Sequence, residues 1–130
     1  MRRTQCEVTR DIDPKEAEDL LERVPRACIA FARPDGPQVQ PVKLARRESR
    51  YLIGGPLDAA SVPDEGGEVV LLVDEGVYLF DVRGIHIRGY IKLTKTLQGL
   101  PEGFTWIELE PSKTTAWDYG RMREVNDASQ

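Results

Sequence analysis

The stretch from Val69 to Leu93 limits the possible folds of this chain more than any other segment. β-branched and aromatic residues dominate it, and these residue types suit a pleated, half-buried surface. Two apolar runs, Val69–Val73 and Val77–Phe80, flank a turn-like Asp-Glu-Gly, and from Ile85 to Leu93 the apolar residues fall mostly on odd positions. The pattern changes phase near Arg83-Gly84, where glycine permits a bulge or a sharp bend. A long strand that turns a corner is what a small closed barrel needs, so the stretch predicts a barrel.

The rest of the chain supplies a helix and further strands. Asp13 can cap a helix, Pro14 suits its first position and Glu16 completes a capping box, so we expect a helix at about 14–24, ended by Pro25. Strands are expected at 27–32, 38–45, 51–54 and 104–110, the last closed by Pro111, with loops at 55–67 and 94–103 and a helical turn at 57–61. This order of elements favours a mainly β (α+β) fold, an antiparallel barrel with one or two helices beside it.

Composition narrows the class of protein. A chain of 130 residues suffices for one domain with one core. The net charge is −4 with acids and bases interspersed, so no nucleic-acid partner is expected. No apolar run reaches the roughly 18 residues that span a bilayer, and the first residues lack the apolar core of a secretion signal, so we expect a cytoplasmic protein with no membrane partner. Residues 1–12 are expected to form an N-terminal arm, 13–123 the barrel domain and 124–130 a C-terminal tail.

Few residues of the sequence indicate a catalytic or metal-binding role by themselves. Cys28 lies in an apolar run and is expected to be a buried thiol, whereas Cys6 lies in a polar segment, and a disulfide between them is disfavoured in a reducing compartment. No Cys/His spacing indicates a metal site. His86 is the only histidine, and neither a haem-ligand role nor a proton-donor role for it has a recognisable partner in the sequence.

Two segments together resemble a known family. The first is 24–42 with its Asp-Gly-Pro turn, and the second combines Arg88-Gly89-Tyr90 with residues 107–121, which end in Trp-Asp-Tyr-Gly-Arg. Both are similar to the pyridoxamine 5'-phosphate oxidase-like proteins, the FMN-binding split-barrel family. The resemblance implies a six-stranded antiparallel split β-barrel that forms a homodimer, with a flavin in a groove between the subunits. It places the cofactor-binding residues at Pro41, Val42, Lys43, Gly54, Gly55, Trp117 and Arg121.

The sequence departs from that family where the cofactor phosphate would lie. Members that hold FMN firmly have a Ser or Thr after the third strand and a Lys some residues on, whereas the segment 54–63 here has no basic residue and carries Asp58. Glycine N–H groups can bind a phosphate but bring no charge, so Lys43, Arg46, Arg47 or Arg88 would have to supply it.

Two hypotheses follow. The first is a flavin-dependent oxidoreductase that acts on an unknown small molecule, with FMN or the deazaflavin F420. The second is a non-enzymatic split-barrel module that has lost flavin binding and binds another ligand or only itself. Whether the chain is an enzyme stays open at this point, and no catalytic residue is assigned.

Plainer roles for the same residues stay open too. Trp117 suits packing or a dimer contact, Arg121 suits a salt bridge to a nearby acid, and Lys43 with Arg46-Arg47 suits a solvated strand end. Four aromatics near the end of the sequence exceed what one small core buries, which favours a homodimer. They are Phe104, Trp106, Trp117 and Tyr119.

Overall fold

The computed structural model describes residues 10–24, 26–47, 49–55, 63–92, 100 and 104–121. Strands carry most of this part of the chain, with one short α-helix and two 3-10 turns. In chain order the elements are β1 (Asp11–Ile12), η1 (Pro14–Ala17), α1 (Asp19–Arg23), β2 (Ala27–Arg33), β3 (Gly36–Arg47), β4 (Arg50–Gly55), β5 (Glu68–Glu75), η2 (Leu79–Asp81), β6 (Arg83–Lys92) and β7 (Thr105–Asp118).

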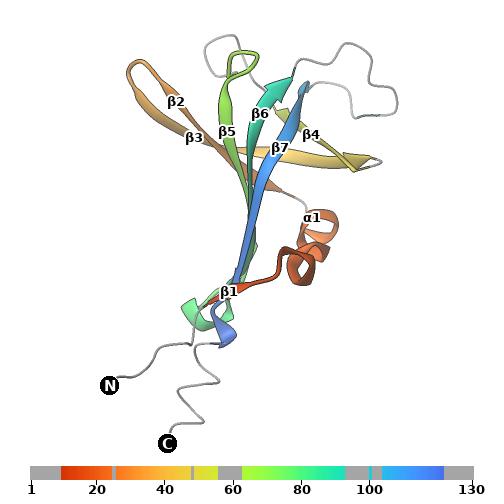
Figure 1. The fold of residues 1–130 in the computed structure, drawn as a ribbon, viewed down its shortest axis with the longest axis vertical. Coiled ribbons are helices and arrows are strands. Elements are labelled where there is room, and N and C mark those ends of the chain that lie inside the picture. Colours follow the sequence, from red (N-terminus) through yellow and green to blue (C-terminus); the bar gives the residue numbers. More distant parts are fainter. Residues whose placement is uncertain are drawn as a thin grey trace, which may run out of the picture.

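The strands close into a barrel (Figure 1). They follow the order β1-β7-β4-β3-β2-β5-β6, every pairing is antiparallel, and β6 pairs back onto β7. Six strands therefore form a closed cylinder, and β1 is a two-residue addition to the lower end of β7. The predicted six-stranded antiparallel barrel is confirmed.

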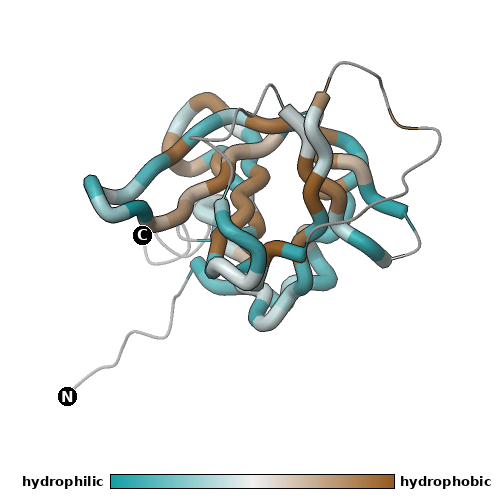
Figure 2. The backbone as a smooth tube through the Cα atoms, turned by 90° about the horizontal axis from the view of Figure 1, so that it is seen from above, coloured by the Kyte–Doolittle hydropathy of each residue, from teal (hydrophilic) through white to brown (hydrophobic). Residues whose placement is uncertain are grey.

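Alternation along the strands places the core inside the cylinder. In β6 the side chains of Ile85, Ile87 and Ile91 are buried, while His86 and Arg88 between them face outward. Viewed from above in Figure 2, apolar stretches line the strands and hydrophilic residues gather at the turns. Burying one such side chain stabilises the fold by roughly 1.5–3 kcal/mol, against about 0–1 kcal/mol for an exposed ion pair, so the interior holds the barrel together.

The predicted helix covers one end of the barrel, but it is divided into two parts. The capping box at Asp13 and Glu16 is present and opens the 3-10 turn η1, and α1 follows after Glu18. Apolar residues at helical spacing enter the core, and Leu20 is fully buried. The helix ends at Arg23, because Val24 already has extended backbone with ψ 123°.

An ion-pair cluster fixes α1 to the barrel. Arg83 of β6 contacts Asp19 of α1 at 2.6 Å and Glu75 of β5 at 3.2 Å, and Arg23 contacts the same two acids at 2.9 and 2.7 Å. Hydrogen bonds from Arg23, the largest cause, and then from Arg83 hold the pKa of both carboxyls below their ordinary values. The cluster thus ties three elements together.

The apolar run Val77–Phe80 does not form the strand that its place in the Val69–Leu93 stretch suggests. Gly76 has φ +120°, a conformation that favours glycine, and the chain turns there into η2. Val77 is 87% exposed and Tyr78 72%, so these side chains do not join the core. The bend expected at Arg83-Gly84 is also absent, since β6 pairs regularly with β5 from Arg83 onward.

The bulge occurs later, and it lets β7 continue through Pro111. Gly89 pairs with Pro111 and Arg88 with Lys113, so Ser112 is an extra residue on β7. The Ser112 hydroxyl donates a hydrogen bond to the Arg88 carbonyl at 3.0 Å. A bulge is one of the few places where a strand tolerates proline, so the prediction that Pro111 closes the last strand is wrong.

Other predictions fall partly outside the described residues. The last two residues of the expected arm, Asp11 and Ile12, pair with Trp117 and Ala116 of β7. The helical turn expected at 57–61, most of the loop 94–103, residues 1–9 and the tail 124–130 lie outside the described part. No helix among the described residues is long and apolar enough to cross a membrane.

Candidate functional site

A small apolar groove brings together five of the seven predicted cofactor-binding residues. It lies where β3 pairs with β4, and the register places Lys43 opposite Gly54. The cavity has a volume of about 240 Å³. Its lining consists of Arg26, Pro41, Val42, Lys43, Gly54, Gly55 and Phe104.

An aromatic pair beside the groove, of which Phe104 is part of the lining, explains a glycine there. Gly54 pairs with Trp106 of β7, and a Cβ on Gly54 would stand 2.7 Å from three atoms of that indole ring. The Trp106 ring thus occupies the space that a side chain at position 54 would need. Phe104 packs edge-on against Trp106, with ring centroids 5.9 Å apart and an angle of 62°. Gly54 therefore leaves room for the Trp106 ring, in addition to lining the groove.

The positive charge at the groove comes from Lys43 and from Arg26, which the sequence interpretation missed. Arg46 is committed elsewhere, because its guanidinium lies 5.2 Å from the Tyr51 ring and within 4.0 Å of Glu18 and Glu22. Arg88 pairs with Glu68 at 3.9 Å. Arg47 also has an interaction of its own. Of the proposed sources of charge, Lys43 alone lines the groove.

Arg26 and Phe104 could have been found only with the strand register in hand. Arg26 directly precedes β2, and because Ala27 pairs with Val42, it lies beside Lys43. Phe104 directly precedes β7, whose first residue Thr105 pairs with Gly55. Neither residue carries a sequence signal of its own.

Trp117 lies at a different apolar cavity, on the outer face of β2, β5, β6 and β7. This cavity has a volume of about 290 Å³. Trp117 covers Gly84, its neighbour on β6, and packs edge-on against His86 with centroids 5.5 Å apart. Cys28 is a free, half-buried cysteine in the same cavity, less buried than expected. The lining consists of Cys28, Ile29, Ala30, Val39, Val70, Leu72, His86 and Trp117.

The electrostatic environment of this outer face disfavours a charged imidazole. Burial is the largest cause that lowers the pKa of His86 from its ordinary value of 6.5, followed by the positive charges of Arg88, Arg10 and Lys113. The Arg10 guanidinium also lies 5.6 Å from the Trp117 ring. His86 is therefore neutral at physiological pH, beside the apolar residues that line the same cavity.

Arg121 is remote from the groove and forms the predicted kind of salt bridge. Its guanidinium contacts Glu16 of η1 at 2.9 Å, at the end of the barrel near β1. One protomer thus brings Pro41, Val42, Lys43, Gly54 and Gly55 together and leaves Trp117 and Arg121 apart. Cofactor contacts of Trp117 and Arg121 stay a prediction that concerns the dimer.

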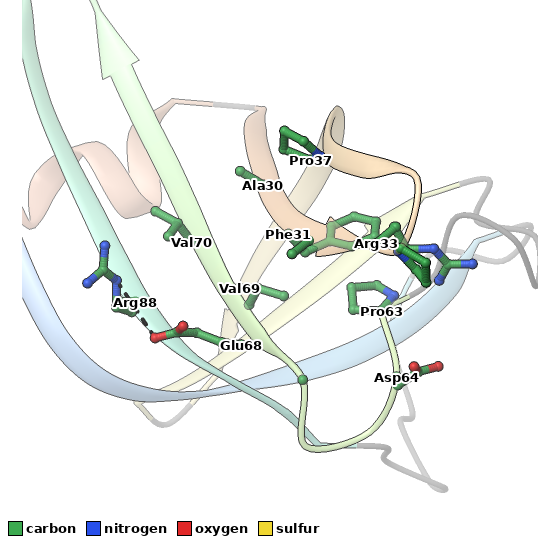
Figure 3. Close-up of a pocket in the computed structure, with 13 residues that line it drawn as sticks. Ala30, Phe31, Arg33, Pro37, Pro63, Asp64, Glu68, Val69, Val70 and Arg88 are labelled. Atoms are coloured by element: carbon green, nitrogen blue, oxygen red, sulfur yellow. Dashed lines mark ion pairs between the residues drawn. The ribbon is translucent and has the colours of Figure 1, made fainter.

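A third and larger cavity, of about 660 Å³, opens where β2 and β5 diverge (Figure 3). Their pairing stops at Phe31 and Val69, and the β2–β3 hairpin leans away from β5 beyond that point (Figure 1). Arg88 and Glu68, joined as an ion pair, lie on one side, and Arg33, Pro63 and Asp64 on the other. No pattern in the sequence marks this divergence.

Metal ligation finds no support in the described ranges. No group of three or more His, Cys, Asp or Glu side chains in them could hold a metal ion.

Comparison with known proteins identifies the fold. No family model matches the chain, and no curated protein matches it by sequence. Among solved structures, an FAD-binding protein from Mycobacterium smegmatis matches with a TM-score of 0.66 at 15% identity, over 82% of this chain and 94% of the other. A candidate pyridoxamine 5'-phosphate oxidase from Corynebacterium glutamicum matches at 0.62 and 15%, over 82% and 94%. An FAD-binding protein from Mesorhizobium loti matches at 0.61 and 13%, over 82% and 95%.

The similarity at these identities concerns the fold. The closed six-stranded barrel and the matched lengths agree with the resemblance inferred from the sequence. The chain therefore has the split-barrel fold of the pyridoxamine 5'-phosphate oxidase-like proteins.

Proposed function

We propose that this chain binds a flavin in the groove between β3 and β4 and acts, as a homodimer, as an oxidoreductase on a small molecule. The observation that carries the proposal is the convergence of Pro41, Val42, Lys43, Gly54 and Gly55 in one groove. Support comes from the fold, because similar structures include proteins described as FAD-binding.

The residues of the groove fit a flavin. Pro41, Val42 and Phe104 offer an apolar wall for the planar ring, and the backbone at Gly55 allows close approach. Lys43 and Arg26 offer positive charge for a phosphate. A bound flavin would supply hydride or electron transfer, and the protein would orient it and exclude water.

A second copy of the chain is needed to complete the site. Ligand pockets usually measure about 300–1,000 Å³, and the groove of one protomer, at about 240 Å³, is smaller. The outer face with Cys28, Ala30, Val39, Val70 and Leu72 is apolar, and Val39 is 70% exposed. Such a face suits self-association around a two-fold axis. We therefore place the dimer contact on this face, next to the groove, with Trp117 at its edge.

Flavin titration tests the proposal. The purified protein is titrated with FMN, FAD and F420, and binding is followed by quenching of flavin fluorescence and by the visible absorbance spectrum. Phe104→Ala should weaken binding because it removes an aromatic wall of the groove. Tyr90→Ala is the matched control, since Tyr90 is also an exposed aromatic but does not line the groove. A protein that binds none of the three cofactors would refute the proposal.

The alternative is a binding module without flavin chemistry. One observation favours it: among the described residues, two cations line the groove, and its glycines, Gly54 and Gly55, bring no charge. This version predicts a stable dimer in light scattering that binds no flavin. A dimer that reduces a bound flavin with NADPH or with reduced F420 would exclude it.

A further inference from the structure

The turn between β5 and β6 presents an exposed apolar surface. We call residues 76–82 the β5–β6 tip. Val77, Tyr78 and Leu79 follow one another in it, and Leu79, the least exposed of the three, is still 62% exposed. The tip has a fixed conformation, because the Asp81 N–H donates a hydrogen bond to the Tyr78 carbonyl at 2.8 Å. Three adjacent apolar side chains on a fixed turn suit a contact with a partner, since little conformational freedom is lost when they are covered.

The large cavity between β2 and β5 lies at the other end of the same strand. Gly67 and Glu68 line it where β5 begins, whereas the β5–β6 tip follows the end of β5 (Figure 1). Phe31, Pro63 and Val69 give it apolar walls (Figure 3). Cavities of about 300–1,000 Å³ hold drug-sized molecules, so about 660 Å³ is room enough for the apolar side chains of a tip.

Leu72 stands midway between the tip and the cavity. It comes five residues after Gly67 and five before Val77, which is roughly 17 Å in either direction along an extended chain. Its side chain lines the apolar outer face between the two. A two-fold axis that crosses β5 at Leu72, at a right angle to the strand, therefore exchanges the two ends of β5. It brings each tip to the partner's cavity, and such an isologous contact closes with two copies.

The charges on β5 agree with this axis. Alternation places Val70 and Asp74 on the same face as Leu72, two residues to either side of it. The axis sets Asp74 opposite the partner's Val70, whose neighbour on β6 is Arg88. Asp74 is exposed and has no ion-pair partner among the described residues. Arg88 has a long contact of 3.9 Å with Glu68, so its charge is available to a closer acid.

The other two-fold arrangement has its axis along β5. It would place the two tips against each other and Asp74 opposite its own copy, where like charges repel. We infer that each β5–β6 tip inserts its apolar side chains into the partner's cavity between β2 and β5, with an ion pair between Asp74 and the partner's Arg88 beside it. This inference rests on the homodimer of the proposed function and names the surfaces that form it.

Charge reversal tests the ion pair across the dimer. Asp74→Arg and Arg88→Glu should each raise the dimer dissociation constant about tenfold or more, and the double variant should return it to within about threefold of the wild type. The pair between Arg88 and Glu68 cannot produce that rescue, because the double variant lacks it too. Glu22→Arg is the matched control, since Glu22 is an exposed acid of α1 that lines none of the three described cavities. Sedimentation velocity over a concentration series gives the constants, and circular dichroism verifies the fold of each variant.

Cysteine cross-linking tests where the tip lies. In a background of Cys6→Ser and Cys28→Ser, a mixture of the Tyr78→Cys and Asp64→Cys proteins should form a disulfide-linked dimer under mild oxidation, because Asp64 lines the cavity. Neither protein alone should do so. A disulfide between two Tyr78→Cys chains would show that the tips meet each other and would overturn the inference.

Truncation of the tip separates failure of this inference from failure of the flavin proposal. Tyr78→Ala should raise the dimer dissociation constant about tenfold or more, as loss of a buried aromatic anchor does. A dimer that Leu72→Glu dissociates, but that neither Tyr78→Ala nor the charge reversals weaken, overturns the inference and leaves the flavin proposal standing. A dimer that responds as expected and binds no FMN, FAD or F420 supports the inference and refutes the flavin proposal. A wild type that is a monomer at micromolar concentration overturns the inference together with the proposed homodimer.

Discussion

Substituting Gly54 by alanine tests the packing of Trp106 beside the groove. The new Cβ would stand 2.7 Å from three ring atoms of Trp106. The ring would have to withdraw by roughly 1 Å to restore ordinary carbon–carbon contact. Overpacking of this kind costs about 1–3 kcal/mol. Because Trp106 is only half-buried, its ring can move, and we expect a loss of about 1–2 kcal/mol in the free energy of unfolding.

The sign of the effect should reverse once Trp106 is removed. In a Trp106→Ala background the space above position 54 is free, and alanine in a strand interior is favoured over glycine by about 0.5–1 kcal/mol. Gly54→Ala is then expected to be neutral or stabilising. The coupling between the two substitutions should reach about 1.5–3 kcal/mol, as for residues in direct contact.

Urea unfolding of the four proteins of this cycle, followed by circular dichroism at one protein concentration, measures the coupling. Gly89→Ala is the contrasting variant, since its Cβ would collide with the backbone oxygen of Glu110, and no side-chain truncation relieves that contact. Gly89→Ala should therefore destabilise the protein in both backgrounds. Equal destabilisation by Gly54→Ala with and without Trp106 would refute the account.

Three further predictions concern charge and assembly. Asp19 and Glu75 have pKa values below their ordinary 3.8 and 4.5, so the unfolded chain binds protons more readily than the folded one. The free energy of unfolding therefore decreases as the pH falls through these ordinary values toward the lower folded-state pKa values. Arg23→Gln should reduce this decrease in unfolding experiments between pH 3 and 7. The pKa of His86 lies below 6.5, so stability should also fall as the pH drops below 6.5, and His86→Gln should lack this component while the acid loss below pH 4.5 remains. Leu72→Glu places a charge on the apolar outer face and should shift the protein to a monomer in sedimentation velocity; a dimer unchanged at micromolar concentration would contradict the assigned contact face.

Strands with alternating apolar and polar residues could be predicted from the sequence, because burial of one face of a strand produces that alternation directly. Ile85, Ile87 and Ile91 are an example, and β6 lies where they indicated. The apolar run at Val77–Phe80 was misleading because it follows a glycine turn and the side chains of Val77, Tyr78 and Leu79 are exposed. Pro111 was misleading for another reason: the extra residue that accommodates it belongs to the pairing between two strands, which no single segment records.

The composition of the groove also depends on strand pairing, which the sequence does not record. Lys43 and Gly54 were predicted from two separate segments, and they meet because β3 and β4 pair in the right register. Arg26 was missed because its place beside Lys43 depends on the register of β2, and Phe104 because it precedes β7 across from the end of β4. The resemblance also grouped Trp117 with these residues, but within one protomer it covers Gly84 and lines the separate cavity on the outer face of β2, β5, β6 and β7.

The pairing of β7 has a consequence for how the chain reaches this structure. β7 is the last strand of the barrel, and it joins β4 on one side and β6 on the other, while its end also holds β1. Without residues 105–118 the five strands β2 to β6 could pair only into an open sheet, whose edges β4 and β6 would lack the partner that β7 provides. Contacts between distant segments form slowly, so a nascent chain that stalls before these residues is expected to need a chaperone to avoid aggregation.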